Sequence, residues 1–288
     1  MPITAEEFET ARPHLLSAAH RMLGSAHDAQ DAVQTAWLRA MTARTSQPIE
    51  NPSAWLTTVT ARVCFDELRA RRRRNEAPLL ADAIPATELD ADEAVLRTED
   101  VSRALMVLLS QLTPPQRVAY VLHDLFSVPF DRIAHVLGGT VPSAKKHASR
   151  ARQRLHNTQH ASERNSQPDQ QIVEAFLTAA QTGDTRRMIQ LLAPDSVRDA
   201  DAVLLPGGAH TAVVGAADIA AETVHFRDRI QAACRLTLNN KPVYLIAPGG
   251  HPLATIEIST ASQKITRITL RSARTGDRFA AALPSKTS

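Results

Sequence analysis

Apolar residues recur at helical spacing through residues 1–75 and predict a bundle of helices. Gly24-Ser25 ends the first helix, and Ser25 with Asp28 three positions later starts the second. Asn51 followed by Pro52 is an N-cap with proline at the first helical position, which starts the third. The predicted buried stripes are Phe8, Leu15, Ala19 and Met22 in the first helix and Ala29, Val33, Trp37 and Met41 in the second; the third helix runs through Trp55, Val59, Val63 and Leu68.

Residues 101–157 predict a second helical domain that ends in a helix-turn-helix. Thr113 before two prolines starts one helix, a short helix follows over 130–137, and Gly138-Gly139 makes the turn. Thr140 then caps a helix that runs from Val141 to about residue 156. A short helix, a glycine turn and a capped basic helix are typical of this motif. The last helix has the inward residues Ala144, Ala148, Ala151 and Leu155, and the cations Lys145, Lys146, Arg150, Arg152 and Arg154.

The pattern changes in residues 168–288, where helices come first and strands follow. Helical periodicity covers 171–181, 185–192 and 217–230, with an irregular stretch over 196–208. Strand-like runs then cover 234–238, 243–247, 253–259 and 265–270, with turns between them. This order predicts an α+β domain with an antiparallel sheet.

Composition narrows the protein class. The 288 residues are 43% hydrophobic, enough for two or three packed domains. No apolar run is long enough to span a membrane, and residues 1–10 are acidic with no signal-peptide core. Cys64 and Cys234 form no disulfide framework or metal-binding pair. We therefore expect a soluble, cytoplasmic protein that does not act at a membrane.

The net charge of +3 alone argues weakly against a nucleic-acid ligand, but its distribution reverses that argument. Residues 101–156 carry +6, on the predicted helix-turn-helix, whereas residues 76–100 carry −7 and contain two prolines. The acidic stretch predicts a flexible linker. The arginine run over 71–74 is equally consistent with DNA binding and with a solvated helix end, where cations interact favourably with the helix dipole. For the last helix, DNA binding is favoured over a solvated face because turn, cap and charge agree.

These residues resemble extracytoplasmic-function sigma factors, the small bacterial sigmas with two conserved helical domains. Residues 28–34 with Trp37 resemble the segment that docks on RNA polymerase core, and Trp55-Leu56 with the arginines after it resemble the helix that recognises the minus-ten promoter element. Residues 112–117, with Ile133-Ala134 and 150–152, resemble the helix-turn-helix that binds the minus-thirty-five element. The match departs at Gln30 and Thr35, where the family usually has acids, and at Lys145-Lys146.

The resemblance implies three sets of contact residues. Core binding, through the beta-prime subunit, falls to Asp28, Asp31 and Gln34. Minus-ten DNA binding falls to Asn51, Ser53, Trp55, Arg62, Arg69, Arg71 and Arg72, with base capture during melting assigned to the start of that helix. Minus-thirty-five binding falls to Thr140, Ser143, Lys145, Lys146, Ser149, Arg150 and Arg152.

The third part resembles the SnoaL-like (NTF2-like) cone fold that one group of these sigma factors carries at the C-terminus. Such cones enclose a pocket, and the polar candidates for it are Asp199, Asp201, His210 and His225, although surface positions are the favoured interpretation. Two of that group's motifs are missing: residues 202–204 replace a glycine-rich stretch, and an asparagine–proline–acid motif is absent from 271–279.

The sequence thus predicts a multidomain protein with a region-two domain over 1–75, the linker over 76–100, a region-four domain over 101–157 and a regulatory domain over 168–288. The predicted function is that of an alternative sigma factor whose C-terminal domain acts in cis through intramolecular contact or an unknown small ligand. We expect no enzyme activity, cofactor or metal. Two alternatives stay open: a DNA-binding regulator that works without core, and a DNA-binding protein fused to an NTF2-like isomerase or cyclase.

Overall fold

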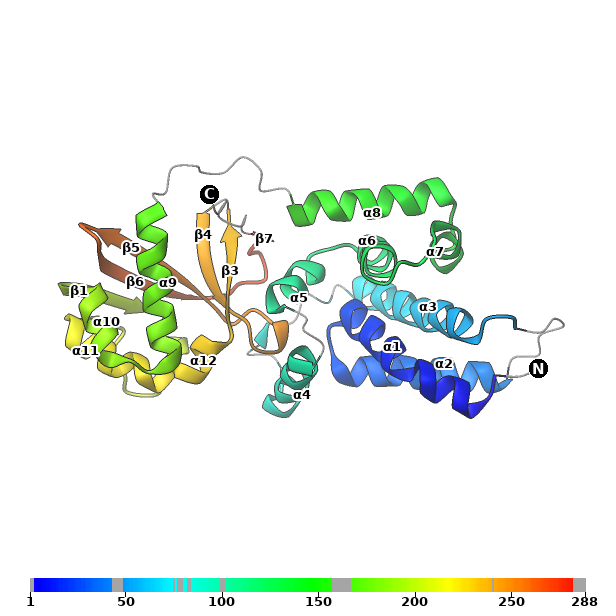
Figure 1. Cartoon of the computed structure of the whole chain (residues 1–288), viewed down its shortest axis with the longest axis horizontal. Helices are drawn as coiled ribbons and strands as arrows, with labels where there is room; N and C mark the ends of the chain where they lie inside the picture. Colours follow the sequence, from blue (N-terminus) through cyan, green and yellow to red (C-terminus); the bar gives the residue numbers. More distant parts are fainter. Residues whose placement is uncertain are drawn as a thin grey trace. The chain divides into compact units, whose positions relative to one another are not determined.

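The computed structural model describes residues 3–42, 49–74, 76, 80–81, 84–98, 102–156, 167–239 and 241–281. The chain forms two compact units (Figure 1). The first contains residues 1–78 and 85–157, and the second contains residues 79–84 and 158–288. Among the helices in these described ranges, none combines the length and the apolarity needed to cross a bilayer.

The first unit begins with the three predicted helices, α1 (Ala5–Leu23), α2 (Ala26–Thr42) and α3 (Pro52–Arg73). Thr4 closes a capping box on α1, and Gly24 ends the helix with a left-handed φ of 83°. Asn51 caps α3 through a 2.9 Å bond from the Ala54 amide. The helices bury a shared apolar core, which includes Leu15, Met22, Val33, Leu56 and Leu68.

A helix in the acidic segment, α4 (Ala86–Thr98), differs from the flexible linker predicted for 76–100. Asp92 and Leu96 lie one turn apart and are 2% and 4% exposed. The Asp92 carboxylate accepts a 2.7 Å hydrogen bond from the amide of Ala26, the first residue of α2. The prediction of a linker rested on the acidic composition of this segment and overlooked the helical spacing of its buried residues. Residues 77–79, 82–83 and 99–100 of the predicted linker lie outside the described residues.

The predicted helix-turn-helix is confirmed by α7 (Phe130–Leu137) and α8 (Val141–His156). Gly138 takes a φ of 65° at the end of α7, a conformation that favours glycine. Ala144, Ala148, Ala151 and Leu155 form the buried stripe of α8, as predicted. The elements before the motif are α5 (Arg103–Ser110), α6 (Pro114–Tyr120) and a π-helical turn η2 (Val121–Leu125).

The two helical domains pack together inside the first unit. Helix α3 contacts α6 and α7. Arg117 of α6 is 6% exposed, and its Nε donates a 3.0 Å hydrogen bond to the Arg21 carbonyl near the end of α1. Burial lowers the pKa of this guanidinium, with the nearby Arg71 charge acting in the same direction. A buried cation at the carbonyl end of a helix is a favourable and specific contact. The spacing of residues in the sequence did not predict it, because Arg117 and Arg21 are far apart in the chain.

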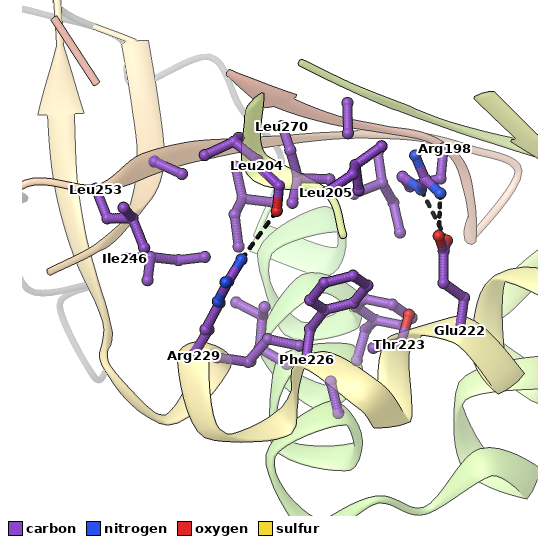
Figure 2. A pocket seen from close by; sticks show the side chains of 18 residues that line it. Arg198, Leu204, Leu205, Glu222, Thr223, Phe226, Arg229, Ile246, Leu253 and Leu270 are labelled. Carbon is purple, nitrogen blue, oxygen red and sulfur yellow. Dashed lines mark hydrogen bonds and ion pairs between the residues drawn. The ribbon is translucent and has the colours of Figure 1, made fainter. Parts of the chain in front are cut away.

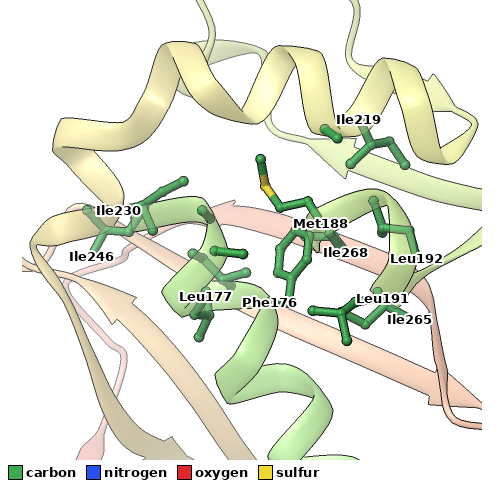
Figure 3. Packing of buried hydrophobic residues seen from close by; sticks show 14 of the residues in the cluster. Phe176, Leu177, Met188, Leu191, Leu192, Ile219, Ile230, Ile246, Ile265 and Ile268 are labelled. Carbon is green, nitrogen blue, oxygen red and sulfur yellow. The ribbon is translucent and has the colours of Figure 1, made fainter. Parts of the chain in front are cut away.

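The second unit is a seven-stranded sheet with strand order β2-β1-β6-β5-β4-β3-β7. Strands β1 and β6 are parallel, and the other pairs are antiparallel. Phe176, Met188, Ile219 and Ile265 lie in the core between the helices and the sheet (Figure 3). The helical elements are α9 (Gln167–Thr182), α10 (Thr185–Leu191), η3 (Ala202–Leu204), α11 (Ala216–Thr223), η4 (Val224–Phe226), α12 (Arg227–Gln231) and η5 (Pro248–Gly250). The strands are β1 (Leu192–Ala200), β2 (Ala212–Val214), β3 (Ala233–Leu238), β4 (Lys241–Ile246), β5 (Ala254–Ala261), β6 (Lys264–Ser272) and β7 (Phe279–Ala281).

The predicted fold class is confirmed: two all-α domains precede an α+β domain in which helices come before most of the strands. The four predicted strands correspond to β3 to β6. Strand β1 was predicted as the end of a helix and an irregular stretch, because Pro194, Asp195 and Arg198 break any apolar alternation. Its pairing with β6 is non-local, so the strand depends on tertiary contacts rather than on its own sequence pattern.

Candidate nucleic-acid interface

Helix α8 presents a continuous polar face opposite its alanine stripe. Lys145, Lys146, Ser149 and Arg150 are exposed and follow one another at spacings of one, three and one residue. The Thr140 hydroxyl accepts a 3.4 Å hydrogen bond from the Ser143 amide, so the start of the helix is fixed. The Lys145 ammonium lies 5.8 Å from the centre of the Phe130 ring. This exposed basic face can bind phosphate oxygens and leaves polar side chains near the helix start for base edges.

Local charge is dense enough on α8 to affect a neighbouring group. Burial, followed by the charges of Arg150 and Lys146, lowers the pKa of His147. The lowered pKa favours the neutral form of this imidazole. A cluster of cations with no acid on the same helix favours a polyanionic ligand.

The structure gives Arg152 a different role from the predicted phosphate contact. Its Nε and Nη2 donate to the two carboxylate oxygens of Asp124 in η2, at 2.6 and 3.2 Å. The hydrogen bond to Asp124 raises the pKa of Arg152. This bidentate pair joins the recognition helix to the preceding turn. The sequence placed Arg152 with the other cations because the position of Asp124 in space was unknown.

Helix α3 carries a second exposed basic stripe. Arg62, Arg69 and Arg72 are all exposed, and spacings of seven and three put them on one helical face. Ser53 is exposed at the start of the helix and Trp55 is half-buried. The Asn51 side-chain oxygen is engaged as the N-cap. The predicted minus-ten residues therefore lie along one helix from its start to its basic end.

Asp28 and Arg71 were predicted to contact polymerase and DNA, but the structure pairs them with each other. Arg71 Nη2 lies 2.5 Å from Asp28 Oδ2, and Arg71 Nε lies 3.0 Å from Glu67 Oε1. Burial works against the Arg71 charge, and the hydrogen bonds to Asp28 and Glu67 outweigh it, so the pKa of Arg71 is raised. The pair ties α2 to α3, which is a structural role.

The rest of the predicted core-docking set lies on an open face of α2. Asp31 and Gln34 are exposed, and Leu38 beside them is 58% exposed. Met41, predicted as buried, is 59% exposed. Residues four apart drift by about 40° per step around an α-helix, so a stripe begun at Ala29 has left the core by Met41. Trp37 instead stacks on Phe8, with ring centres 4.5 Å apart. Sequence reasoning missed Leu38 as a surface residue.

A cavity in the second unit lies between the sheet and the helices (Figure 2). The space between its lining side chains, together with the open solvent at its mouth, amounts to about 740 Å³. None of the four predicted pocket residues lines it. Alternation along β1 points Arg198 and Ala200 into the cavity, whereas Asp199 forms an ion pair with Arg267. Asp201 accepts a 2.9 Å hydrogen bond from the Ser272 amide, and His210 and His225 are exposed.

Within the described ranges, no group of three or more histidine, cysteine or acidic side chains is placed to hold a metal ion. The cavity carboxylate of Glu222 is paired with Arg198.

Two family models match this chain, one in each of its two helical domains. Residues 8–74 match Sigma-70 region 2, and residues 102–155 match Sigma-70 region 4. The chain is 41% identical over 198 residues to the ECF RNA polymerase sigma factor SigJ of Mycobacterium tuberculosis, an alignment that covers 66% of this chain and 62% of SigJ. It is 29% identical over 206 residues to the probable ECF sigma factor SigI of the same species, with 70% of each chain covered.

Two solved structures show similarity, one over most of this chain and one over a smaller share of it. The crystal structure of M. tuberculosis SigJ is 31% identical, covers 93% of this chain and 96% of its own, and has a TM-score of 0.44. An NTF2-like protein of unknown function from Cytophaga hutchinsonii is 12% identical, covers 38% of this chain and 94% of its own, and has a TM-score of 0.27.

Proposed function

The chain belongs to the extracytoplasmic-function RNA polymerase sigma factors, and we propose that it binds the polymerase core, directs it to a promoter and helps to melt the DNA. The observation that carries this proposal is the presence of two exposed basic helix faces, on α3 and α8, in domains that follow the order of regions two and four. A regulator with one DNA-binding helix would need only one of them.

We assign minus-thirty-five recognition to α8. Thr140 and Ser143 lie at its start, where base edges are read, and Lys145, Lys146, Ser149 and Arg150 supply phosphate and base contacts. Minus-ten recognition falls to Asn51, Ser53 and Trp55 at the start of α3, with Arg62, Arg69 and Arg72 on the backbone. Arg71 and Arg152 hold the helices in place, so their contribution to DNA binding is indirect.

We assign core docking, on the beta-prime subunit, to the exposed face of α2. Asp31, Gln34 and Leu38 lie on this face at spacings of three and four. An exposed leucine flanked by polar side chains is typical of the centre and rim of a protein interface. Because polymerase and promoters are cytoplasmic, the chain would act in the cytoplasm.

We further propose that the second unit regulates the first through the segment that joins regions two and four. Ala81 belongs to the second unit, is 4% exposed, and donates its amide to the Pro252 carbonyl at 3.0 Å. The segment between the two DNA-binding domains is thus held by the C-terminal domain. A change in that domain would alter how freely the two DNA-binding domains move. We assign the unit a regulatory role, and the pairing of its cavity carboxylate, Glu222, with Arg198 supports this assignment.

Co-purification with RNA polymerase core separates this proposal from a regulator that works without core. The full chain should co-purify with core, and Leu38→Asp should reduce core affinity at least tenfold. Ile189→Asp, at a site in the second unit that is 40% exposed, is the matched control and should leave core affinity unchanged. Absence of core binding by the unmodified chain would refute the sigma-factor assignment.

The regulatory proposal has its own test. Ala81→Arg places a large cation where the alanine is buried and should change the amount of transcript made per mole of chain. Ala86→Arg, at an exposed position five residues later, should not. Equal activity of Ala81→Arg and the unmodified chain would rule out regulation through this segment and leave the core-binding proposal untouched.

A further inference from the structure

The cavity of the second unit has an apolar body. The sheet forms one wall, and helices α9, α11 and α12 form the other (Figure 2). Binding sites for small organic molecules are concave, mostly apolar and carry a few polar groups that orient the ligand, and this cavity has that composition. Its apolar lining includes Phe176, Leu177, Leu204, Leu205, Phe226, Ile230, Ile246, Leu253, Ile256, Ile268 and Leu270.

Two arginines line the cavity, and their surroundings differ. Arg198 is 5% exposed, and its Nε lies 2.9 Å from Glu222 Oε2. Its Nη1 donates to the carbonyls of His210 and Thr211 at 3.1 and 3.0 Å. Arg198 and Glu222 therefore neutralise one another, and this end of the cavity offers no net charge to a ligand.

Arg229 is the other arginine, and it lies on α12 at the cavity wall. Its guanidinium donates a 2.8 Å hydrogen bond to the Leu204 carbonyl and lies 5.9 Å from the centre of the Phe226 ring. Among the described residues no carboxylate forms an ion pair with it. Figure 2 shows the side chain reaching from α12 toward Leu204 on the opposite side of the cavity. The Arg229 side chain is exposed, so a positive group stands at the solvent-facing edge of the apolar space, and its hydrogen-bond acceptor is a neutral carbonyl.

The segment opposite Arg229 is the short 3-10 turn η3 together with Leu205, which follows it, and Leu204 and Leu205 line the cavity. Val203, the residue before Leu204, is 78% exposed. The segment is fixed at one end by Asp201, whose amide donates to the Leu270 carbonyl at 3.0 Å. Besides its apolar contacts, the turn is joined to α12 through the Arg229 hydrogen bond to Leu204. A ligand group that binds Arg229 would replace the Leu204 carbonyl. The carbonyl is uncharged and is therefore a weaker hydrogen-bond acceptor than a carboxylate.

We propose that this cavity binds an amphiphile with an apolar body and a single carboxylate head group, with the head on Arg229 and the body among the apolar side chains. The carboxylate would accept a bidentate pair of hydrogen bonds from the guanidinium. The neutral Arg198–Glu222 pair at the other end excludes a second charge from the ligand. This proposal concerns binding by the second unit and does not depend on the action of the chain on polymerase.

Calorimetric titration of the full chain with matched ten-carbon probes tests it. Decanoate should bind, and decanol and decyltrimethylammonium, which lack the carboxylate, should bind at least tenfold more weakly. Arg229→Gln should weaken decanoate binding by about tenfold or more and leave decanol unchanged. Arg227→Gln is the matched control: Arg227 is exposed on the same helix, donates to the Gln181 carbonyl, and does not line the cavity.

Each outcome decides part of the proposal. Equal binding of decanoate and decanol, or an unchanged decanoate affinity in Arg229→Gln, would overturn the head-group assignment. No binding of any probe would overturn the site. Arg229→Lys keeps the charge and should retain most of the affinity lost in Arg229→Gln, which separates a charge effect from a folding effect.

Discussion

Replacing Asp92 tests whether the acidic segment is part of the first unit. Asp92→Ala removes the acceptor of the Ala26 amide at the start of α2, 2.7 Å away, and leaves that buried N–H unpaired. The lost cap and the unpaired donor should together cost about 1–3 kcal/mol. For a unit of this size, a loss of 1 kcal/mol lowers the melting temperature by about 2–4 °C. We therefore expect a decrease of about 2–12 °C.

Tryptophan fluorescence during heating is a suitable assay because both tryptophans, Trp37 and Trp55, lie in the first unit. Asp90→Ala is the control: Asp90 is exposed on the same helix, and its loss should change stability by less than about 0.5 kcal/mol. A flexible linker would make the two variants equivalent. Equal melting temperatures for Asp92→Ala and Asp90→Ala would therefore refute the packing of α4 on α2.

Three further predictions follow from buried and strained groups. Burial raises the pKa of Cys64 from 9.0 to about 12, so at pH 8 its thiolate is about 1,000-fold scarcer than in an unburied cysteine. Mass spectrometry after iodoacetamide treatment should therefore find Cys64 unmodified in the native chain. Alkylation of Cys64 at the rate of a free thiol would contradict this prediction. Gly24→Ala puts a Cβ 3.2 Å from Arg117 Nη2 at a φ of 83° and should lower the free energy of unfolding in urea by about 1–2 kcal/mol. Gly139→Ala, whose Cβ would meet no atom closer than 3.9 Å, should lower it by less. Similar losses in the two variants would argue against a tight contact at Gly24. Arg150→Gln should reduce the slope of log affinity for DNA against log salt concentration by about 1. Arg152→Gln should lower the melting temperature and leave that slope unchanged. A reduced slope in Arg152→Gln would mean that the ion pair with Asp124 opens when the chain binds DNA.

Local sequence patterns predicted α1, α2, α3 and the helix-turn-helix correctly, whereas α4 was predicted as a flexible linker. Caps such as Asn51, the glycine at 138 and the alanine stripe of α8 act within a few residues, so they can be read without the fold. The basic faces could also be predicted, because exposure on a helix follows from spacing.

Partners that are distant in sequence could not be predicted. Arg71 and Asp28 are 43 residues apart, and Arg152 and Asp124 are 28 apart, so spacing alone could not show that these ion pairs form. The same applies to β1, whose polar residues become a strand only beside β6. The residues that do line the cavity could not be identified, because alternation on the unrecognised strand β1 decides that Arg198, rather than Asp199, points inward.

Run-off transcription on genomic DNA with purified polymerase core tests the central claim most directly. The account predicts transcripts from discrete start sites that require both core and this chain. It also predicts that the pair Lys146→Ala and Arg150→Ala abolishes them, whereas Arg186→Ala, at an exposed arginine of the second unit, preserves them. Failure of the unmodified chain to direct any core-dependent transcript, or full activity of the Lys146 and Arg150 double variant, would contradict the assignment of α8 to promoter recognition.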